Sequence, residues 1–388
     1  MEIVFWVAIF IILYTYIGYG LLLFVLLKIK NIIGGKRLVE KLGYTPTVTI
    51  IVAAYNEAYI IEEKILNTLE LTYPSEKISF IFITDGSTDQ TNEIVAKYPQ
   101  INGMHIPDRA GKIAAVHRAM FEVETDIVVF TDANTMVNKE AILYICRHYA
   151  DASVGAVAGE KRVQIDDNAD ATAGEGFYWK YESKLKKWDS ELYSVVGAAG
   201  ELFSIRTNLY EPVAPDTILD DFMISMNIAL KGFRIVYEPE AYALEKPSAD
   251  TGEELKRKIR IAAGGVQSTI RLKSLFLPFK QPVLSFEFIS HRILRWLVTP
   301  YLMPIVFIIN GWFLYKYGLT SMYGLIAIGQ LFFYGASFLG WQLEKKQLKI
   351  KIFFIPYYFC LMNYAVIAGL YRYFFGIQTV LWEKAKRK

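Results

Sequence analysis

The chain has 388 residues, of which 53% are hydrophobic and 15% aromatic, and its formal net charge is +3. So small a charge does not favour nucleic-acid binding, and two cysteines, Cys146 and Cys360, are too few for a disulfide framework. The four histidines show no metal-ligand spacing, so ordinary packing or surface positions are expected for them. The apolar residues are concentrated at the two ends, whereas residues 46–275 have the composition of a soluble α/β protein.

Residues 1–28 predict an N-terminal transmembrane helix. The run from 3 to 27 is uncharged and almost wholly apolar, and about 20 such residues span a bilayer. It is too long for the apolar core of a cleaved signal peptide, and no basic region precedes it. Lysines and arginines follow it directly, so the positive-inside rule places the next domain, 46–275, in the cytosol.

The domain at 46–275 begins with alternating strands and helices. Apolar, β-branched runs predict strands at 47–53, 78–84, 104–106 and 126–131, and helical patterns fall between them at 58–68, 89–97 and 112–123. Such alternation is typical of a parallel sheet covered by helices on both faces. In sheets of this kind, ligands bind at the carboxyl ends of the strands.

Polar and acidic residues follow three of these strands. Tyr55, Asn56 and Glu57 come after the first, Asp85 after the second, and Asp132 with Asn134 after the fourth. A simple turn would explain the segment 85–89 alone, but the convergence of three such strand ends favours a ligand site. Asp85 suits hydrogen bonds from a base or ribose, Asp132 suits a divalent cation, and Asn134 adds a neutral oxygen ligand.

The segment 108–112 has the chemistry of a diphosphate site. Arg109 and Lys112 supply positive charge beside Gly111, which allows close approach of a ligand. The segment is not a Walker A loop, and the first strand is not followed by GxGxxG, so a dinucleotide cofactor is disfavoured. Further on, Asp220 and Asp221 precede a predicted helix. They suit helix capping and, equally, a general base whose pKa is raised by its neighbour.

Three apolar runs near residues 293–315, 322–343 and 352–375 predict C-terminal transmembrane helices, within a region taken as 293–377. The preceding segment, 276–292, mixes apolar and charged residues and predicts an amphipathic helix at the membrane surface, with a plain linker as the alternative. Four spans would leave the basic tail, 378–388, outside, against the positive-inside rule. The side on which the C-terminus lies therefore stays open.

Together these motifs resemble glycosyltransferase family 2, in particular its membrane-bound bacterial polysaccharide synthases. The resemblance runs from about residue 48 to 267 and rests on motifs in the family's order and spacing: VAAYNE (52–57), ITDGSTDQT (83–91), DRAGKIAAVHRAM (108–120), VVFTDANT (128–135), GAAGELFSIR (197–206) and LDDF (219–222). It implies an α/β GT-A-like domain with a mostly parallel sheet, plus α-helical transmembrane segments at both ends. It also implies an integral protein of the cell (inner) membrane with a cytosolic catalytic domain.

The resemblance implies a role for each matched residue. Tyr55, Glu57 and Asp85 would hold a nucleotide, most simply uridine, and Lys112 would face its diphosphate. Asp132 and Asn134 would hold Mg or Mn at the position of the family's Asp-x-Asp motif. Asp221 would be the base of an inverting transfer from a UDP-sugar to a glycan or lipid-linked acceptor. Arg109 and Asp220 complete the expected substrate-binding set.

Two departures from the family pattern bear on activity. Asn134 replaces the second aspartate of the metal motif, which predicts weaker cation binding. The Gln-x-x-Arg-Trp motif of polymerising members keeps its arginine as Arg260, expected to bind substrate, but has Ile261 for the tryptophan. Processive synthesis is therefore in doubt, and a channel built from so few spans would require a homo-oligomer.

Two other classes of protein remain as alternatives. One is a non-catalytic membrane subunit that binds sugar nucleotides, against which the retention of Asp85, Asp132 and Asp221 argues. The other is a nucleotidyltransferase, which would need a glycine-rich loop after the first strand.

Overall fold

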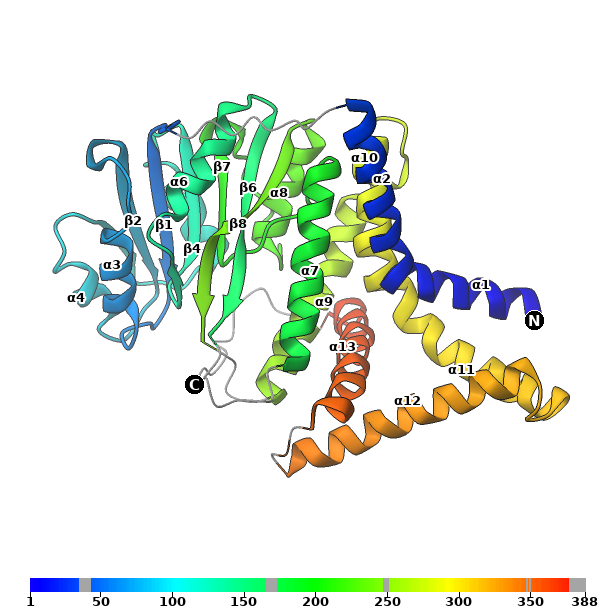
Figure 1. The fold of residues 1–388 in the computed structure, drawn as a ribbon. Helices are drawn as coiled ribbons and strands as arrows, with labels where there is room; N and C mark the ends of the chain where they lie inside the picture. Colours follow the sequence, from blue (N-terminus) through cyan, green and yellow to red (C-terminus); the bar gives the residue numbers. More distant parts are fainter. Residues whose placement is uncertain (35–42, 165–172, 247–250, 347, 349, 377–388) are drawn as a thin grey trace. The chain divides into compact units, whose positions relative to one another are not determined.

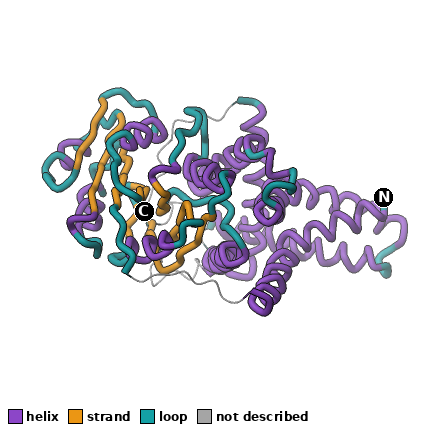
Figure 2. The backbone as a smooth tube through the Cα atoms, turned by 90° about the horizontal axis from the view of Figure 1, so that it is seen from above, coloured by secondary structure: helices purple, strands orange, loops and turns teal. Residues whose placement is uncertain are grey.

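The computed structural model describes residues 1–34, 43–164, 173–246, 251–346, 348 and 350–376. The chain divides into two compact units. A helical unit comprises Met1–Leu26, Ile165–Leu185 and Asp250–Gln378, and an α/β unit comprises Leu27–Gln164, Lys186–Ala249 and Thr379–Lys388. The described strands all belong to the α/β unit (Figures 1 and 2).

The α/β unit is built on one eight-stranded sheet of order β3-β2-β1-β4-β7-β6-β8-β5 (Figure 1). The strands are β1 (Val48–Ala54), β2 (Ile78–Asp85), β3 (Asn102–Ile106), β4 (Ile127–Asp132), β5 (Thr135–Val137), β6 (Val154–Val163), β7 (Leu202–Arg206) and β8 (Arg234–Glu245). The four strands expected from the sequence are β1 to β4, and they pair in parallel. The expected α/β GT-A-like sheet is confirmed, and it is mixed and mostly parallel.

The parallel half of the sheet gives way to a mixed half at β7. This strand pairs antiparallel with both β4 and β6, β6 and β8 are parallel, and β5 pairs antiparallel with β8. A core of aliphatic residues from β1, β4, β6 and their helices lies against the sheet. Every residue of β1 except Ala53 is buried, as expected for a strand covered on both faces.

Helices and short helical turns connect the strands of the α/β unit. They are α3 (Ile61–Leu69), η2 (Ser75–Lys77), α4 (Thr91–Val95), α5 (Lys112–Met120), α6 (Ala141–Cys146), η3 (Arg147–Ala150), η5 (Thr207–Leu209) and α8 (Asp220–Leu230). The predicted helices at 58–68, 89–97 and 112–123 correspond to α3, α4 and α5. Helix α7 (Ala173–Leu192) supplies residues to both units.

The helical unit contains long apolar helices. Its elements are α1 (Glu2–Leu13), η1 (Tyr14–Gly18), α9 (Thr251–Arg271), η6 (Lys273–Phe276), α10 (Pro282–Glu287), η7 (Phe288–Val298), α11 (Thr299–Tyr317), α12 (Met322–Lys345) and α13 (Lys351–Phe374). Helix α2 (Tyr19–Gly34), like α7, supplies residues to both units. In the described chain, four helices are long and apolar enough to cross a membrane: Glu2–Gly34, Pro282–Tyr317, Met322–Lys345 and Lys351–Phe374. These coincide with the apolar runs predicted from the sequence.

The helix that begins at Pro282 continues without a break to Tyr317. The predicted boundary near residue 293, between an interfacial segment and a spanning helix, therefore falls inside one helix. Its π-helical part, η7, carries buried charge, because Glu182 of α7 binds Arg295 at 2.5 Å and His291 at 3.2 Å. The interfacial role of 276–292 stays a prediction, and the basic tail at 378–388 lies outside the described residues.

Candidate active site

The turn after β1 is bonded to the loop after β2. Asn56 adopts a left-handed backbone conformation (φ 54°), and its Oδ1 accepts hydrogen bonds from the amides of Thr88 (2.8 Å) and Asp89 (3.4 Å). In return, Thr91 Oγ1 accepts from the amide of Glu57 at 2.8 Å. The polar residues of the second motif thus fix the backbone of the first, and Glu57 is buried beside them.

Tyr55, expected to hold the nucleotide, and Arg109, expected beside the diphosphate, lie together. The Arg109 guanidinium carbon is 3.9 Å from the centre of the Tyr55 ring, a cation–π contact. A close approach at Gly86 holds Arg109 in place. Gly86 has φ +67°, and a Cβ there would lie 2.8 Å from the Arg109 nitrogen. The two side chains are therefore set side by side by a backbone contact that only glycine permits.

Asp85 holds the loop that carries Arg109 and Lys112. One carboxylate oxygen accepts from the amides of Ala110 (3.0 Å) and Gly111 (2.6 Å), and the other accepts from Arg118 at 3.0 Å. A carboxylate has about four acceptor positions, so one remains for a ligand. Asp85 therefore has a structural function, and its contact with a nucleotide stays a prediction.

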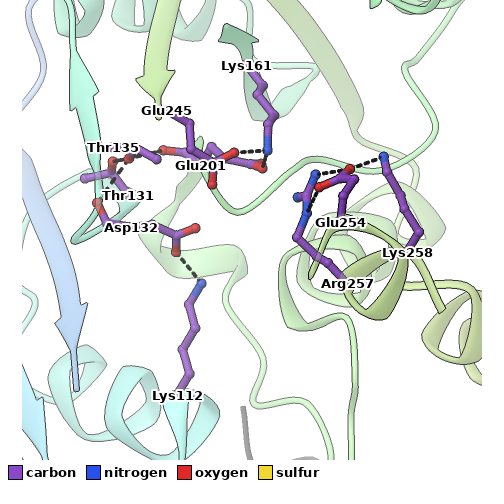
Figure 3. A network of polar contacts seen from close by, with 10 residues as sticks. All are labelled: Lys112, Thr131, Asp132, Thr135, Lys161, Glu201, Glu245, Glu254, Arg257 and Lys258. Atoms are coloured by element: carbon purple, nitrogen blue, oxygen red, sulfur yellow. Dashed lines mark hydrogen bonds and ion pairs between the residues drawn. The ribbon is translucent and has the colours of Figure 1, made fainter. Parts of the chain in front are cut away.

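Lys112 and Asp132 form the centre of the site. Lys112 begins α5, Asp132 ends β4, and their Nζ and Oδ1 atoms are 2.6 Å apart (Figure 3). Burial by itself would lower the pKa of Lys112, but Asp132 and Asp220 raise it above its ordinary value. Burial raises the pKa of Asp132, although Lys112 opposes that shift. The pair places one fixed positive charge among several carboxylates.

Asn134, the other expected cation ligand, lies in the turn that follows Asp132. Its Oδ1 is buried and accepts no hydrogen bond from any described residue. That atom fits a neutral oxygen ligand of a hard cation. Among the described residues, no three His, Cys, Asp or Glu side chains are grouped to hold a metal. The donor set consequently suits Mg²⁺ or Mn²⁺ shared with substrate phosphates rather than a closed protein site.

Asp220 and Asp221 open α8, and their geometry bears on both capping and chemistry. The N-cap of α8 is Leu219, whose side chain makes no capping hydrogen bond. The Oδ1 atom of Asp221 accepts from the amide of Phe222, in the first turn of the helix, at 2.8 Å. Burial and the neighbouring Asp220 carboxylate together raise the pKa of Asp221 to about 7, although Lys112 opposes that shift. The bond from Phe222 serves the start of the helix, and the raised pKa in addition suits a general base.

Gly200 lies between Asp221 and the Lys112–Asp132 ion pair. A Cβ at this position would lie 3.2 Å from Asp221 Oδ2 and 3.3 Å from Lys112 Nζ. The absence of a side chain at Gly200 therefore leaves Asp221 and Lys112 facing the same space. A reacting hydroxyl there could approach Asp221 while the leaving group lay near Lys112.

A layer of polar residues, all buried except the half-buried Glu201, lies behind the turn 132–134, and the sequence motifs did not reveal it. It consists of Lys64, Thr131, Thr135, Lys161, Glu201 and Glu245 (Figure 3 shows all but Lys64). Lys161 binds both Glu201 and Glu245, and the backbone oxygen of Glu201 accepts from Thr131 Oγ1 at 2.9 Å. One signal was available for Lys64, since Ile61, Lys64, Ile65 and Thr68 form the buried stripe of α3.

Arg260, the remaining predicted substrate contact, lies on α9 in the helical unit. On the same helix, Arg257 and Lys258 both pair with Glu254, at 3.0 and 3.5 Å (Figure 3). The role of Arg260 stays a prediction.

The mixed sheet and the motifs at its edge define a glycosyltransferase domain of the GT-A fold. Residues 49–213 match the model of glycosyl transferase family 2. The chain therefore carries a family 2 glycosyltransferase domain.

The relatives of this domain include a polysaccharide synthase. The poly-beta-1,6-N-acetyl-D-glucosamine synthase of Staphylococcus aureus is 29% identical over 234 residues, which are 58% of this chain and 56% of that protein. The matched part thus spans just over half of that relative. The Staphylococcus epidermidis synthase is 25% identical over 346 residues, 82% of each chain.

A solved structure shares the fold. The mannosyltransferase PcManGT of Pyrobaculum calidifontis, in complex with GDP-Man and Mn2+, matches with a TM-score of 0.72 and 22% identity. The match covers 97% of this chain and 100% of that one. At this identity the likeness establishes the fold alone.

Proposed function

We propose that the protein is an inverting glycosyltransferase that moves a sugar from a nucleoside diphosphate sugar, a UDP-sugar in the first instance, to a saccharide or lipid-linked acceptor at the membrane. Surface polysaccharide synthesis is the process that fits such an enzyme, given its homology to the staphylococcal synthases. The observation that carries the proposal is the placement of a carboxylate with a raised pKa, Asp221, beside the Lys112–Asp132 pair.

The proposed reaction is a single displacement at the sugar's anomeric carbon. The acceptor oxygen forms the new bond as the bond to the diphosphate breaks, and Asp221 takes the acceptor's proton. Lys112 stabilises the negative charge that develops on the departing diphosphate, and Arg109 with Tyr55 binds the nucleotide end. Because the lysine is held in place before the reaction, its charge acts without reorganisation.

Asp132 and Asn134 are the proposed protein ligands of a divalent cation, Mg²⁺ or Mn²⁺. The orphan oxygen of Asn134 supports this assignment. A bound cation would neutralise charge on the diphosphate.

The four apolar helices support a place in a membrane, and the basic residues after the first support a cytosolic α/β unit. An inner-membrane location completes the proposal. The base of the donor nucleotide is a separate question, because the archaeal structure of the same fold contains GDP-Man. Donors on both uracil and guanine therefore belong in the test.

The decisive experiment measures nucleotide release by the full chain in nanodiscs. A panel of UDP- and GDP-sugars is supplied with Mg²⁺, Mn²⁺ or a chelator, with short saccharides and extracted lipids as acceptors. Release and transfer with one donor, both lost in chelator, are expected. If donors bind by calorimetry but no acceptor is glycosylated, a non-catalytic subunit replaces the enzyme as the better description.

The pKa of Asp221 predicts an acid limit to activity. The ordinary pKa of an aspartate is 3.8, and burial with Asp220 raises that of Asp221 to about 7. A base must be unprotonated, so transfer should fall as the pH drops below about 7, by about tenfold per unit. The pH dependence of kcat/KM for the acceptor measures this fall, which is the acid limb of the pH profile.

Asp220→Asn provides the control for that pH limb. It removes the carboxylate that raises the pKa of Asp221, so the acid limb should move to lower pH even if the maximal rate also falls. A limb that stays at the same pH would assign the ionisation to another group.

A further inference from the structure

Lys64 is a fully buried cation in the middle of the α/β unit. It lies on α3, has no exposed surface, and points from the helix toward the sheet, where it meets the ends of β4 and β5. Its Nζ donates to Thr131 Oγ1 at 2.9 Å and to the backbone oxygen of Thr135 at 2.7 Å. These two residues flank the turn 132–134 that carries the proposed cation ligands.

Burying an ammonium group carries a desolvation penalty that works against fold stability. Burial lowers the pKa of Lys64 to about 7, while the charge of Asp132 acts in the opposite direction. An apolar side chain of the same length would fill the space without the desolvation penalty. What only the lysine provides is a pair of directed hydrogen bonds that fix both ends of one short turn.

The hydrogen bonds of Lys64 continue, through Thr131, to the loop that faces Asp221. Thr131 Oγ1, which accepts from Lys64, itself donates to the backbone oxygen of Glu201. Glu201 follows Gly200, the residue between Asp221 and Lys112. A single hydroxyl thus links Lys64, the cation turn and the loop that faces the base.

We propose that Lys64 is a positioning residue for the divalent-cation site, acting on Asp132 and Asn134 through Thr131 and Thr135 without touching substrate. The inference rests on the proposed function, because it presupposes that this turn binds a cation. Replacement of such outer partners typically weakens metal binding by about 10- to 100-fold. Lys64→Met should therefore weaken Mn²⁺ binding by a factor in this range.

Mn²⁺ titration followed by electron paramagnetic resonance, with UDP present, tests the proposal on the full chain. The matched control is Lys77→Met. Lys77 also donates to a backbone oxygen and a hydroxyl, both of Thr45 (2.9 and 3.1 Å), but it lies at the amino end of β2. We expect weaker Mn²⁺ binding only in Lys64→Met, with unchanged UDP affinity in chelator and transfer restored at high Mn²⁺.

Three outcomes separate the possibilities. A folded Lys64→Met protein with wild-type Mn²⁺ affinity overturns the proposal. If that variant does not fold, Thr131→Val decides, because it keeps the lysine but removes the linking hydroxyl; unchanged Mn²⁺ affinity there also overturns it. A wild-type chain that binds no Mn²⁺ refutes the cation site of the proposed function instead.

Discussion

Asp221→Asn is expected to abolish transfer while leaving nucleotide binding nearly unchanged. The amide matches the carboxylate in size but cannot take the acceptor's proton, and a general base typically contributes about 10²- to 10⁴-fold to the rate. The Asp221 side chain accepts from the amide of Phe222, and the oxygen of the asparagine amide preserves that bond. Single-turnover transfer and UDP calorimetry measure the two effects separately.

Asp126→Asn is the matched control for that substitution. Asp126 is an exposed carboxylate that precedes β4 at the amino end of the sheet, where it accepts from Thr47. Its replacement should leave transfer within about twofold of wild type, since surface substitutions rarely change stability by more than about 0.5 kcal/mol. Transfer by Asp221→Asn at near the wild-type rate would remove the residue from the base role.

Gly197→Ala should disable the site and destabilise the α/β unit. Gly197 has φ +81°, and a Cβ there would lie 2.1 Å from the Phe222 ring. The left-handed backbone costs a non-glycine residue about 1–2 kcal/mol, and overpacking a core adds about 1–3 kcal/mol. Because Phe222 adjoins Asp221, moving the ring also moves the base. Denaturant unfolding and transfer rate should both show a loss.

Gly232→Ala separates the two causes. Gly232 has φ +91°, but a Cβ there would meet nothing within 4 Å. This variant should show only the backbone penalty, with transfer retained in the folded fraction. Equal losses in both variants would mean that the Phe222 contact is unimportant.

Local patterns in the sequence were sufficient for the parallel half of the sheet. The buried, β-branched runs of β1, β2 and β4 predict their own strands, and each is followed by a motif that marks its carboxyl end. The insertion of β7 between β4 and β6 depends on pairing between residues far apart in the chain, such as Phe130 with Phe203. No local periodicity specifies that partner or its antiparallel direction.

The site was predictable where chemistry is visible in residue type. Lys112, Asp132 and Asp221 were expected to act together, and the structure brings them together around Gly200. Lys64 and Lys161 were missed, because a lysine in a helix or strand is usually exposed. Only the buried stripe of α3 hinted that Lys64 points inward. Asp85 was expected to contact a nucleotide, which stays a prediction, and its two hydrogen bonds to the loop 109–112 were not foreseen.

Because of the hydrogen bonds between the turn after β1 and the loop after β2, substitutions in the two motifs are expected to have non-additive effects. Asn56 accepts from the amide of Thr88, and Thr91 accepts from the amide of Glu57, so a substitution in one motif changes the effect of substitutions in the other. A library that diversifies these positions one at a time would then record most variants as failures. Altering donor preference would require joint variation of both motifs, with Asn56 and Thr91 kept as a fixed frame.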